Sequence, residues 1–410
     1  MGRRLLATAI ASLLLRQLDL QHTTSEHNAS GVHHREGGLP KKPIADRRDT
    51  IGDRLGGSAR IGVVDFFSGC GGTSAGLRAA GMDIVAGIDI DRDAASTFTH
   101  NFPEAKFIRA DITKLKTNAL RPFIDDSRPL LFSACAPCQP FSKQRRGRAA
   151  GDTRVPLLLE FVRFVKYYRP MYVFIENVPG LQTLSVEMGP FPEFTRRMTS
   201  LGYHLDARVI DSCDYGVPQR RRRLVIIGSR GMTVPFPRPT HGPGTRRPKY
   251  STVWDWISDL PPLSAGEIHP RIKNHRASGL SPKNLERIRA TPEGGGREHW
   301  PKHLLLPCHH DDYDGHTDVY GRMRRNAPAS GLTTRCISLS NGRFGHPTQD
   351  RAISVREAAC LQTFQRSFTF AGSLNSMARQ IGNAVPVVLA KRFGQAFVRH
   401  FRRNGANLPA

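Results

Sequence analysis

Between about residue 60 and residue 230, short runs of apolar and β-branched residues alternate with segments in which apolar residues recur every three or four positions. An apolar run bounded by small residues is typical of a buried strand, whereas the longer spacing is typical of an amphipathic helix. The predicted strands lie within 60–67, 83–90, 106–113, 129–137, 171–180, 203–216 and 222–230, and the predicted helices within 73–81, 91–102, 155–170 and 192–202. This alternation predicts an α/β fold with an open, mostly parallel sheet and helices on both faces.

The pattern changes after about Gly231, where the chain becomes dense in proline and glycine. The next stretch, about a hundred residues long, is rich in histidine, arginine and glycine and has little periodicity, so we expect a second, loop-rich domain. Near the end, residues 354–364 predict a helix, and residues 378–401 predict a turn and then a long amphipathic helix. Residues 21–59 are polar and aperiodic, and we expect residues 1–57 to form a disordered extension.

The composition indicates what kind of partner the protein binds and in which cellular compartment it works. The 410 residues include 60 lysines and arginines and 35 acidic residues, which gives a formal net charge of +25. This excess favours a polyanionic partner, with nucleic acid first, although a basic protein without such a partner can have the same composition. The cysteines are unevenly spaced and number seven, which indicates reduced thiols in a cytoplasm rather than the disulfide framework of a secreted protein.

The amino-terminal segment bears on that compartment. Arg3 and Arg4 precede a short apolar run, as in a secretory signal, but Arg16 follows at once and no clear cleavage site comes after the run. No apolar stretch reaches the ~20 residues that a membrane-spanning helix needs. We therefore expect a cytoplasmic protein with no membrane partner.

A glycine-rich turn stands where the first predicted strand becomes a helix, in the segment DFFSGCGGTSAG. Gly69 and Gly71 allow the backbone to approach a ligand closely, beside the positive end of a helix dipole. The spacing departs from the usual dinucleotide pattern, so pyrophosphate binding is not required. Asp89 ends the second strand, where an acidic side chain can hold ribose hydroxyls, and Asp111 ends the third, where it can bind a base amine. The alternative is a tight turn without a ligand.

Cys135 and Cys138 form a C-x-x-C pair at the end of the fourth predicted strand. A zinc site would need two more ligands, and the other cluster of cysteine and histidine, at 308–316, lacks the paired spacing, so we expect no metal. A thioredoxin-like pair would open a helix, but a basic loop follows here. We therefore favour a single nucleophilic thiol at the carboxyl end of a strand.

Further polar groups support a catalytic site. Glu176 and Asn177 end an apolar strand, where open α/β sheets place their ligands. A carboxyl group partly removed from water there suits an acid that donates a proton near neutral pH, although a carboxylate that caps a helix would have the same pattern. In the run QRRRR, strand alternation sends Arg221 and Arg223 to one face and the other two arginines to the opposite face, so one pair can point into the site.

Six segments, in this order, resemble the motifs of the DNA cytosine-5 methyltransferases, especially the bacterial restriction-modification type. They are DFFSGCGG, PCQPFS, ENVPG, QRRRR, GRFGHPTQDRAISVREAACLQTF and QIGNAVP, and the resemblance extends from about Ile61 to Phe397. Each motif alone is modest evidence, but six in order are specific. The resemblance implies a Rossmann-like AdoMet-dependent methyltransferase sheet with a smaller, loop-rich target-recognition domain. It also implies S-adenosyl-L-methionine as cofactor and 5-methylcytosine in DNA as product.

The resemblance assigns roles by matching positions. Cys138 matches the nucleophile, Glu176 the acid, and Arg221 and Arg223 the two arginines of the catalytic motifs. The positions that match cofactor contacts are Asp65, Phe67, Gly69, Gly71, Asp89, Ile90, Asp111, Ile112, Pro137 and Asn383. The basic loop after the nucleophile matches the segment that closes over DNA, and its expected DNA contacts are Gln139, Ser142, Lys143, Arg145 and Arg146. The sequence departs from the common motifs at Cys70, Cys135, Ala136 and Gln365, but no catalytic residue type is lost.

The chemistry of the family explains these residue types. A thiolate at Cys138 would add to C6 of cytosine while Glu176 protonates N3, which makes C5 nucleophilic enough to take a methyl group. C6 cannot be reached inside a duplex, so the base must flip into the pocket. A basic loop that closes over the flipped base would exclude water and complete the site.

The resemblance also divides the chain into an extension at 1–57, a catalytic domain at 58–230, a target-recognition domain at 231–374, and a carboxy-terminal helix at 375–410 that completes the catalytic domain. We expect a monomer that binds double-stranded DNA, either as the modification enzyme of a restriction system with a cognate endonuclease or as an orphan methylase. The arginine-rich segments 244–249 and 320–326 are candidate phosphate contacts. A non-catalytic relative would have lost Cys138 or Glu176, and an RNA methyltransferase of this fold would not need the long insertion at 231–341.

Overall fold

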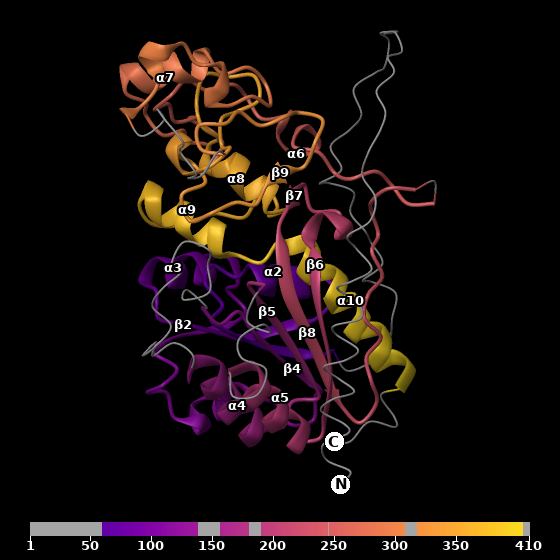
Figure 1. Ribbon diagram of the computed structural model, residues 1–410. Coiled ribbons are helices and arrows are strands. Elements are labelled where there is room, and N and C mark those ends of the chain that lie inside the picture. The colour runs from indigo at the N-terminus through magenta and orange to yellow at the C-terminus, as the bar shows by residue number, and fades with distance from the viewer. Residues whose placement is uncertain (1–59, 138–155, 180–189, 245, 308–317, 405–410) are drawn as a thin grey trace. The chain divides into compact units, whose positions relative to one another are not determined.

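The computed structural model describes residues 60–137, 156–179, 190–244, 246–307 and 318–404, so the predicted extension at 1–57 lies outside the described residues. Its centre is a seven-stranded sheet in the order β3-β2-β1-β4-β5-β8-β6 (Figure 1). The strands are β1 (Gly62–Phe66), β2 (Asp83–Asp89), β3 (Lys106–Arg109), β4 (Leu130–Ala134), β5 (Tyr172–Asn177), β6 (Tyr203–Asp211) and β8 (Arg222–Arg230). β1 to β5 pair in parallel, whereas β8 runs antiparallel to both β5 and β6. The predicted α/β fold with a mostly parallel sheet is confirmed.

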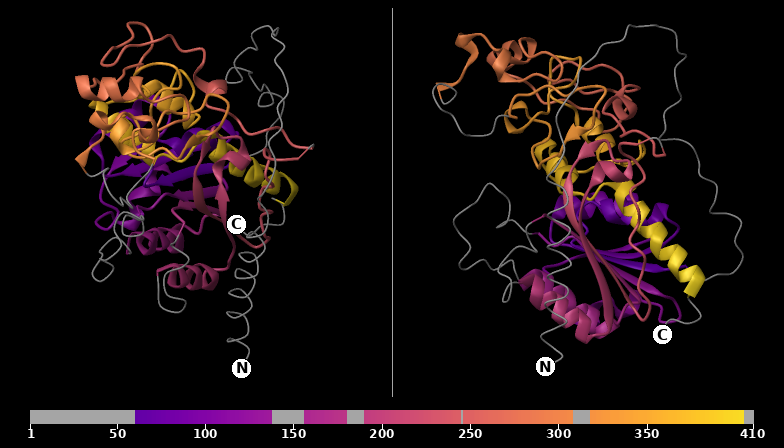
Figure 2. Two further views of the ribbon diagram at one scale, coloured as in Figure 1. Left: turned by 45° about the horizontal axis from the view of Figure 1, so that its top comes forward. Right: turned by 45° about the vertical axis from the view of Figure 1, so that its right-hand side comes forward.

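Helices cover both faces of the sheet because its central strands are apolar on both sides. Every residue of β1, β4 and β5 is buried. Val63 of β1 belongs to a core with residues of α2 (Gly72–Ala79), α3 (Arg92–Asn101) and α10 (Val387–Asn404). Its neighbour Val64 belongs to a second core with α4 (Pro156–Tyr168) and α5 (Pro190–Ser200) (Figure 1 and Figure 2). The alternation of side chains along each strand therefore builds two cores, one on each face.

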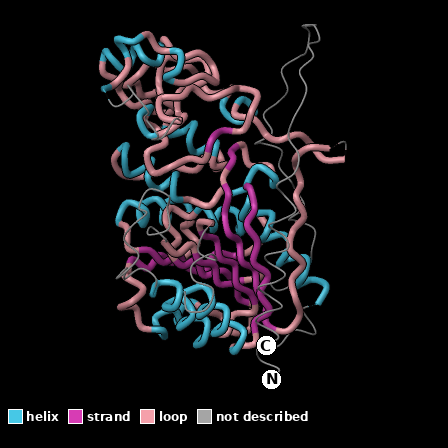
Figure 3. Tube along the Cα trace, viewed as in Figure 1, coloured by secondary structure: helices cyan, strands magenta, loops and turns pink. Residues whose placement is uncertain are grey.

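The described residues between β8 and α9 run mostly as loops, with short helices among them (Figure 3). The elements in this region are α6 (Trp254–Ile257), α7 (Pro282–Arg289), β9 (Ala329–Ser330), α8 (Val355–Leu361) and the 3-10 helices η8 (Arg297–His299), η9 (Lys302–Leu304) and η11 (Leu339–Asn341). Two other 3-10 helices, η3 (Thr117–Phe123) and η7 (Ser212–Tyr215), belong to the sheet region. β9 pairs in parallel with β7 (Gln219–Arg220), which immediately precedes β8. This short ladder joins the loop region to the sheet.

A fully buried ion pair fixes the segment before α8. Arg351 and Glu357 are 0% and 1% exposed, and both Nη atoms of the arginine donate to the carboxylate at 2.7 Å. Glu357 also accepts the backbone N–H of Ser354, and the hydroxyl of Ser354 accepts the N–H of Glu357 in return. This capping box sets where α8 begins.

The carboxy-terminal region differs from the prediction at one point. The segment 378–401, expected to begin with a turn, begins instead with residues 378–383 as the second half of α9 (Leu374–Asn383), and residues 384–386 separate α9 from α10. α9 begins early because Ser373 caps it, its hydroxyl accepting the N–H of Ser376 at 3.2 Å. Met377 and Ile381 then face the core at helical spacing. A window that starts at 378 omits the cap and the first turn, and this hides the helical period. The predicted helix at 354–364 and the long amphipathic helix are confirmed as α8 and α10.

Candidate active site at the carboxyl edge of the sheet

The predicted site residues gather at the edge of the sheet where β1, β2, β4 and β5 end. Parallel strands place their carboxyl ends at one edge, and open α/β sheets bind ligands there. Backbone hydrogen bonds connect the segments that follow these strands. The N–H of Ser68 donates to Ile88 O at 3.0 Å, and the N–H of Cys135 donates to Phe66 O at 3.3 Å. The turn after β1, the end of β2 and the segment after β4 are therefore neighbours.

The turn after β1 has the backbone of a ligand-binding loop. Phe67 has a φ of 55°, a left-handed conformation that is rare for an aromatic residue and often found at functional sites. Gly71 caps α2 with a φ of 93°, and a Cβ atom there would lie 2.4 Å from the ring of Phe102. Gly69 differs, because a Cβ atom added to it would meet no atom within 4 Å. The turn is thus tightly packed at Gly71 and open at Gly69.

Asp89 closes this turn from the end of β2. One carboxylate oxygen accepts the N–H of Gly69 at 2.8 Å, and the other accepts the N–H of Asp91 at 2.9 Å. Burial raises the pKa of Asp89, and these backbone hydrogen bonds oppose the rise. Ile90 follows with 66% of its surface exposed, so an apolar side chain stands free beside the carboxylate. The two residues together offer a hydrogen-bond acceptor and a surface for a flat ring.

Ser68 contributes a hydroxyl that the sequence prediction missed. It is 8% exposed, and among the described residues its Oγ has no hydrogen-bond partner. Because nearly all buried polar groups in folded proteins are hydrogen-bonded, an unpartnered hydroxyl at this edge is available to a ligand. The signal in the sequence was its place between Phe67 and Gly69 in the glycine-rich turn.

Asp65 lies behind the turn. It has no exposed surface, and its two carboxylate oxygens accept the hydroxyls of Ser74 at 2.6 Å and Ser133 at 2.7 Å. Burial raises the pKa of Asp65 to about 6, although both serine hydrogen bonds act in the opposite direction. The carboxylate therefore connects β1, α2 and β4 and supports the turn from inside the protein.

Asp111 and Ile112 follow β3 and have different surroundings. Asp111 is partly exposed and accepts the hydroxyl of Thr113 at 2.8 Å, and its hydrogen bonds with Thr113 lower its pKa. Ile112 is buried in the core beneath α4, and its carbonyl accepts Nη2 of Arg163 at 2.9 Å. Asp111 thus keeps surface for a ligand, whereas the side chain of Ile112 packs inside the protein.

Cys138 and the predicted DNA contacts Gln139, Ser142, Lys143, Arg145 and Arg146 lie outside the described residues. The description of this segment ends at Pro137, which is exposed. Cys135 lies before it, with its Sγ 3.6 Å from Oγ1 of Thr73 on α2. Burial raises the pKa of Cys135 well above its ordinary value, and the negative charges of Glu176 and Asp65 add to the rise. Cys135 is therefore a packed, protonated thiol and unlike a reactive thiolate.

Glu176 is held at the end of β5 by a guanidinium. It is 7% exposed, and Nε of Arg223, on the adjacent β8, lies 2.9 Å from its Oε1. Asn177 donates from Nδ2 to Ala136 O at 3.2 Å, which ties the end of β5 to the segment that leads to Cys138. The predicted acid, one of the two predicted arginines and the approach to the predicted nucleophile are thus brought together.

Arg221, unlike Arg223, does not pair with Glu176 but binds backbone carbonyls. Its guanidinium donates to Leu332 O at 2.6 Å and to Gly382 O at 2.8 Å, and only 6% of the residue is exposed. Burial and the positive charge of Arg223 lower its pKa to about 9. The other two arginines of the run are exposed, as the alternation predicted. Arg221 and Arg223 nevertheless have different partners. Arg223 pairs with a carboxylate, and Arg221, between β7 and β8, links this part of the chain to the loop region and to α9.

Asn383 ends α9 beside the glycine-rich turn. It is exposed, and the residues after it pack on α2, where a Cβ atom on Gly72 would lie 2.6 Å from Val385 O. The Sγ of Cys70 also donates to Gln380 O at 3.6 Å. α9 and the segment after it therefore contact the glycine-rich turn and the start of α2, although 310 positions separate Cys70 from Gln380 in the chain.

One of the two arginine-rich segments predicted to contact phosphates, 320–326, has a buried arginine and two exposed ones. Arg322 is 4% exposed and donates to Asp350 and to several backbone carbonyls, so the prediction of a phosphate contact is wrong for this residue. Arg325 forms an ion pair with Glu293 at 2.9 Å. The other segment, by contrast, exposes Arg246 and its neighbours.

Two absences hold for the part of the chain that the structure describes. No group of three or more histidine, cysteine, aspartate or glutamate side chains is placed to hold a metal ion. No helix there combines the length and the apolar character needed to cross a membrane.

Comparison with known proteins identifies the family of this chain. The model of the family described as C-5 cytosine-specific DNA methylase matches residues 61–399. The Type II methylase M.HgiDII of Herpetosiphon aurantiacus is 37% identical over 342 residues, which cover 82% of this chain and 95% of that protein. The Type II methyltransferase M1.HphI of Haemophilus parahaemolyticus is 34% identical over 339 residues, covering 82% of this chain and 86% of that protein.

Solved structures share the fold. A DNA modification methyltransferase encoded within an Escherichia coli prophage has a TM-score of 0.64 at 22% identity, covering 83% of this chain and 99% of that one. The methyltransferase EhMeth of Entamoeba histolytica has a TM-score of 0.57 at 14% identity, covering 84% of this chain and 99% of that one. The family expected from the six motifs is therefore confirmed, and this chain belongs to the C-5 cytosine-specific DNA methylase family.

Proposed function

We propose that the methyl transfer of this family takes place at the carboxyl edge of the sheet, where Glu176 and Arg223 bind the target cytosine and Cys138 attacks it. The observation that carries this assignment is the buried ion pair, in which a carboxylate and a guanidinium stand 2.9 Å apart beside the segment that leads to Cys138. Cytosine presents an amine at N4 and acceptors at N3 and O2. A carboxyl group suits N3 and N4, and an adjacent guanidinium suits O2.

Cys138 and Glu176 supply the groups for the first step of the reaction. The thiolate of Cys138 forms a bond to C6 while Glu176, in its protonated form, gives that proton to N3, and the displaced electron pair makes C5 nucleophilic. S-Adenosyl-L-methionine, the cofactor of this family, supplies the electrophilic methyl group. Loss of the C5 proton to a base then expels the sulfur of Cys138 from C6, and N3 returns its proton. Arg223 holds the carboxyl group of Glu176 in one orientation throughout.

The turn after β1 fits the cofactor. Asp89 offers a carboxylate for the ribose hydroxyls, and Ile90 offers an exposed apolar surface for the adenine ring. Ser68 adds an unpartnered hydroxyl, and the open space at Gly69 leaves room for the ligand next to the backbone. We assign cofactor binding to these four residues, with Asp65 as their support. For the other matched positions the assignment rests on the resemblance: Phe67, Gly71, Asp111, Ile112, Pro137 and Asn383.

The proposal also covers how the protein recognises DNA and where in the cell it works. Residues 231–374 would recognise the target sequence, residues 58–230 with 375–410 would form the catalytic domain, and the loop after Cys138 would close over the flipped base. The net charge of +25 and the exposed Arg246 and Arg247 support binding to a duplex. Because the relatives are Type II methylases, we propose a cytoplasmic monomer that works with a cognate endonuclease or as an orphan methylase.

Trapping with a modified base tests the nucleophile. Duplex DNA that contains 5-fluorocytosine should form a covalent adduct with the wild-type protein and cofactor, because fluorine cannot leave C5 as a proton does. Cys138→Ala should form none while keeping its affinity for DNA. An adduct with Cys138→Ala would overturn the assignment, and an adduct on RNA but not on DNA would change the substrate class.

Two further variants test the ion pair. Glu176→Gln should lower kcat about 100-fold or more, because general acid help is lost. Arg223→Gln should also lower kcat, since Glu176 loses its partner. The matched control is Arg222→Gln, which removes the same charge from the adjacent exposed position. Equal effects at 222 and 223 would show that only the net charge matters. Bisulfite sequencing of DNA from an expressing host would identify the target sequence.

A further inference from the structure

The connection between α9 and α10, residues 384–386, packs against the start of the helix that follows the glycine-rich turn. A Cβ atom on Gly72, the first residue of α2, would lie 2.6 Å from Val385 O and 3.0 Å from Cβ of Ala384. Because the two segments approach each other this closely, a movement of the connection displaces the N-terminus of α2. Whatever fixes the connection therefore also fixes the turn in which we place the cofactor.

Two consecutive residues after α8, Gln362 and Thr363, hold both sides of this connection, and we call them the clamp. Gln362 has no exposed surface, and its Nε2 donates to Ile381 O at 2.7 Å and to Ala384 O at 3.1 Å. The backbone carbonyl of Gln362 accepts the N–H of Val387, the first residue of α10, at 3.1 Å. One residue thus binds the end of α9 and the beginning of α10.

A second buried amide orients the side chain of Gln362. Its Oε1 accepts Nε2 of Gln219 at 2.8 Å, and Gln219 also has no exposed surface. Gln219 in turn donates to Leu361 O at 3.0 Å and accepts the N–H of Leu332 at 3.1 Å. Each polar atom of the two amides therefore has a partner, and a fully satisfied buried network of this kind holds its members in one orientation.

Thr363 has a strained backbone. It is 4% exposed and has a φ of 63°, a left-handed conformation that a β-branched residue rarely adopts. Its N–H donates to Cys360 O at 2.8 Å, and the N–H of Phe364 donates to Ala359 O at 2.9 Å. This pair of hydrogen bonds ends α8 with Thr363 at the position where glycine is the usual residue. Strain of this kind persists only where the surroundings hold it, and it is often found at functional positions.

The hydroxyl of Thr363 makes a contact that glycine could not make. Its Oγ1 accepts the N–H of Val388, the second residue of α10, at 2.9 Å. The first N–H groups of a helix need an acceptor from outside the helix, and Pro386, which precedes α10, has no side-chain oxygen to offer. Gln362 and Thr363 therefore cap α10 in place of the residue before it.

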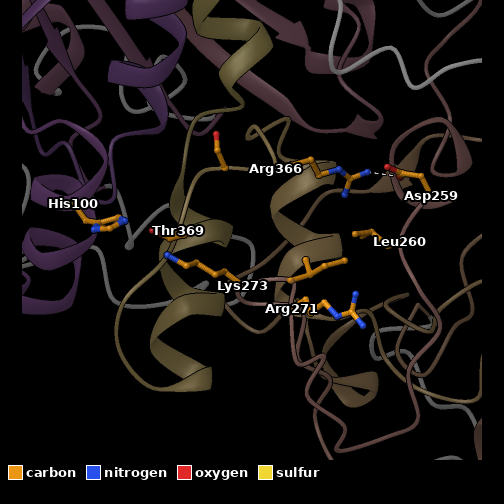
Figure 4. A pocket seen from close by; sticks show the side chains of 9 residues that line it. His100, Asp259, Leu260, Arg271, Lys273, Arg366 and Thr369 are labelled. Carbon is orange, nitrogen blue, oxygen red and sulfur yellow. Dashed lines mark hydrogen bonds and ion pairs between the residues drawn. The ribbon is translucent and has the colours of Figure 1, made fainter.

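The segment that follows the clamp is anchored as well. Figure 4 shows Arg366 paired with Asp259 at a pocket whose lining also includes Thr369. The N–H of Thr369 donates to Asn101, the last residue of α3, at 3.0 Å. The chain is thus fixed by α8 before the clamp and by side-chain contacts after it, which explains how the left-handed backbone of Thr363 is maintained.

We propose that Gln362 and Thr363 are positioning residues for the cofactor. They fix the 384–386 connection, the connection supports α2 at Gly72, and α2 follows the turn of Ser68 and Gly69. The inference rests on the proposed function in one respect, that the cofactor binds at this turn. It adds two buried residues that act through other parts of the chain. Loss of the clamp should weaken cofactor binding and leave the chemical step largely intact.

Three substitutions at position 363 separate the hydroxyl from the strain. Thr363→Val keeps the shape and removes the acceptor, Thr363→Ser keeps the acceptor, and Thr363→Gly removes both the acceptor and the strain. Calorimetry on the full-length protein should show the dissociation constant of S-adenosylhomocysteine rising about fivefold for the valine and glycine variants. It should stay within about twofold of wild type for Thr363→Ser, because the hydrogen bond is kept.

The kinetic constants test the same idea. The KM for S-adenosyl-L-methionine should rise about fivefold in Thr363→Val while kcat for DNA methylation stays within about twofold of wild type, because only cofactor binding is weakened. A fall in kcat with an unchanged KM would show that the clamp does not act on the cofactor.

Unfolding in urea distinguishes positioning from a purely structural role. Thr363→Gly loses a hydrogen bond but relieves the strain, so its midpoint should lie close to that of wild type. Thr363→Val loses the same hydrogen bond and keeps the strain, so it should unfold at a lower urea concentration. Both variants should nevertheless weaken the cofactor alike. Weak binding in the valine variant with normal binding in the glycine variant would follow stability instead, and would refute the inference.

The matched control is Thr97→Val on α3. Thr97 has no exposed surface, and its hydroxyl accepts the N–H of Ala371 at 2.9 Å, so the substitution removes the same kind of contact before the start of α9. It should leave the affinity for S-adenosylhomocysteine within about twofold of wild type. An equal loss in Thr97→Val and Thr363→Val would show that any lost contact of this kind has the same effect, and that the clamp has no special role.

Asp89→Ala separates failure of this inference from failure of the proposed cofactor site. It should raise the dissociation constant of S-adenosylhomocysteine about 30-fold, because hydrogen bonds to a charged group are lost. If Asp89→Ala weakens binding and Thr363→Val does not, the clamp is wrong and the cofactor site stands. If neither variant weakens binding, the cofactor lies elsewhere and both assignments are wrong.

Discussion

The Asp65 carboxylate is the clearest point at which the structure predicts how stability changes with pH. Asp65 has no exposed surface, and burial raises its pKa from 3.8 to about 6. The folded protein therefore binds this proton more tightly than the unfolded chain does. A group of this kind adds stability that is fully present below pH 3.8 and is lost as the pH rises through 6. The full effect is about 3 kcal/mol, because the pKa rises by roughly two units at 1.36 kcal/mol each.

Asp65→Asn removes the titration and keeps the shape. The amide oxygen can still accept the hydroxyl of Ser74 or Ser133, and the amide nitrogen can donate to the other serine. We expect the variant to be at least as stable as the wild type at pH 8, where the wild type carries a buried charge. As the pH falls to 4.5, the wild type should gain about 2 kcal/mol of unfolding free energy relative to the variant.

Urea unfolding of both proteins between pH 4.5 and pH 8 measures this difference directly. The control is Asp125→Asn at an exposed turn, where hydrogen bonds from Ser127 lower the pKa of the carboxyl group. Its difference from the wild type should be small and of opposite sign, since a lowered pKa gives stability that is lost as the pH falls. A difference between wild type and Asp65→Asn that stays constant with pH would refute the reasoning, because it would mean that Asp65 titrates alike in both states.

Three further variants test other contacts. Arg221→Met removes a costly buried charge but leaves two carbonyls without a donor, so we expect the unfolding free energy to change by less than about 2 kcal/mol. Its kcat for DNA methylation should still fall about tenfold, because the segment between β7 and β8 loses its link to α9. An unchanged kcat, as expected for the exposed control Arg222→Met, would contradict this. Cys135→Ser should keep kcat within about twofold, since Thr73 remains as a hydrogen-bond partner, and a dead enzyme would make the two cysteines a functional pair. Glu357→Gln leaves the charge of Arg351 buried without its carboxylate and should cost about 3–5 kcal/mol in urea unfolding, so a loss below 1 kcal/mol would count against a net contribution of this pair.

Local sequence pattern was sufficient to predict most of the strands and helices and part of the candidate site. The alternation of strands and helices, the glycine-rich turn and the position of Glu176 at a strand end are properties of short segments, and the structure has them where the sequence predicted them. The alternation along QRRRR likewise predicted that Arg220 and Arg222 are exposed. These features depend on the period of a strand or a helix, and that period is visible in neighbouring residues.

The partners of those residues were decided by tertiary contacts. Strand alternation sends Arg221 and Arg223 to the same side, but Arg221 donates to the carbonyls of Leu332 and Gly382, whereas Arg223 pairs with Glu176. The sequence alone does not reveal whether an arginine side chain binds a phosphate or donates to a backbone carbonyl more than a hundred positions away. The hydroxyl of Ser68 is a similar case, because its lack of a hydrogen-bond partner among the described residues depends on which groups the fold brings near it. Burial and hydrogen-bond satisfaction are properties of the packed chain, and only the tertiary structure determines them.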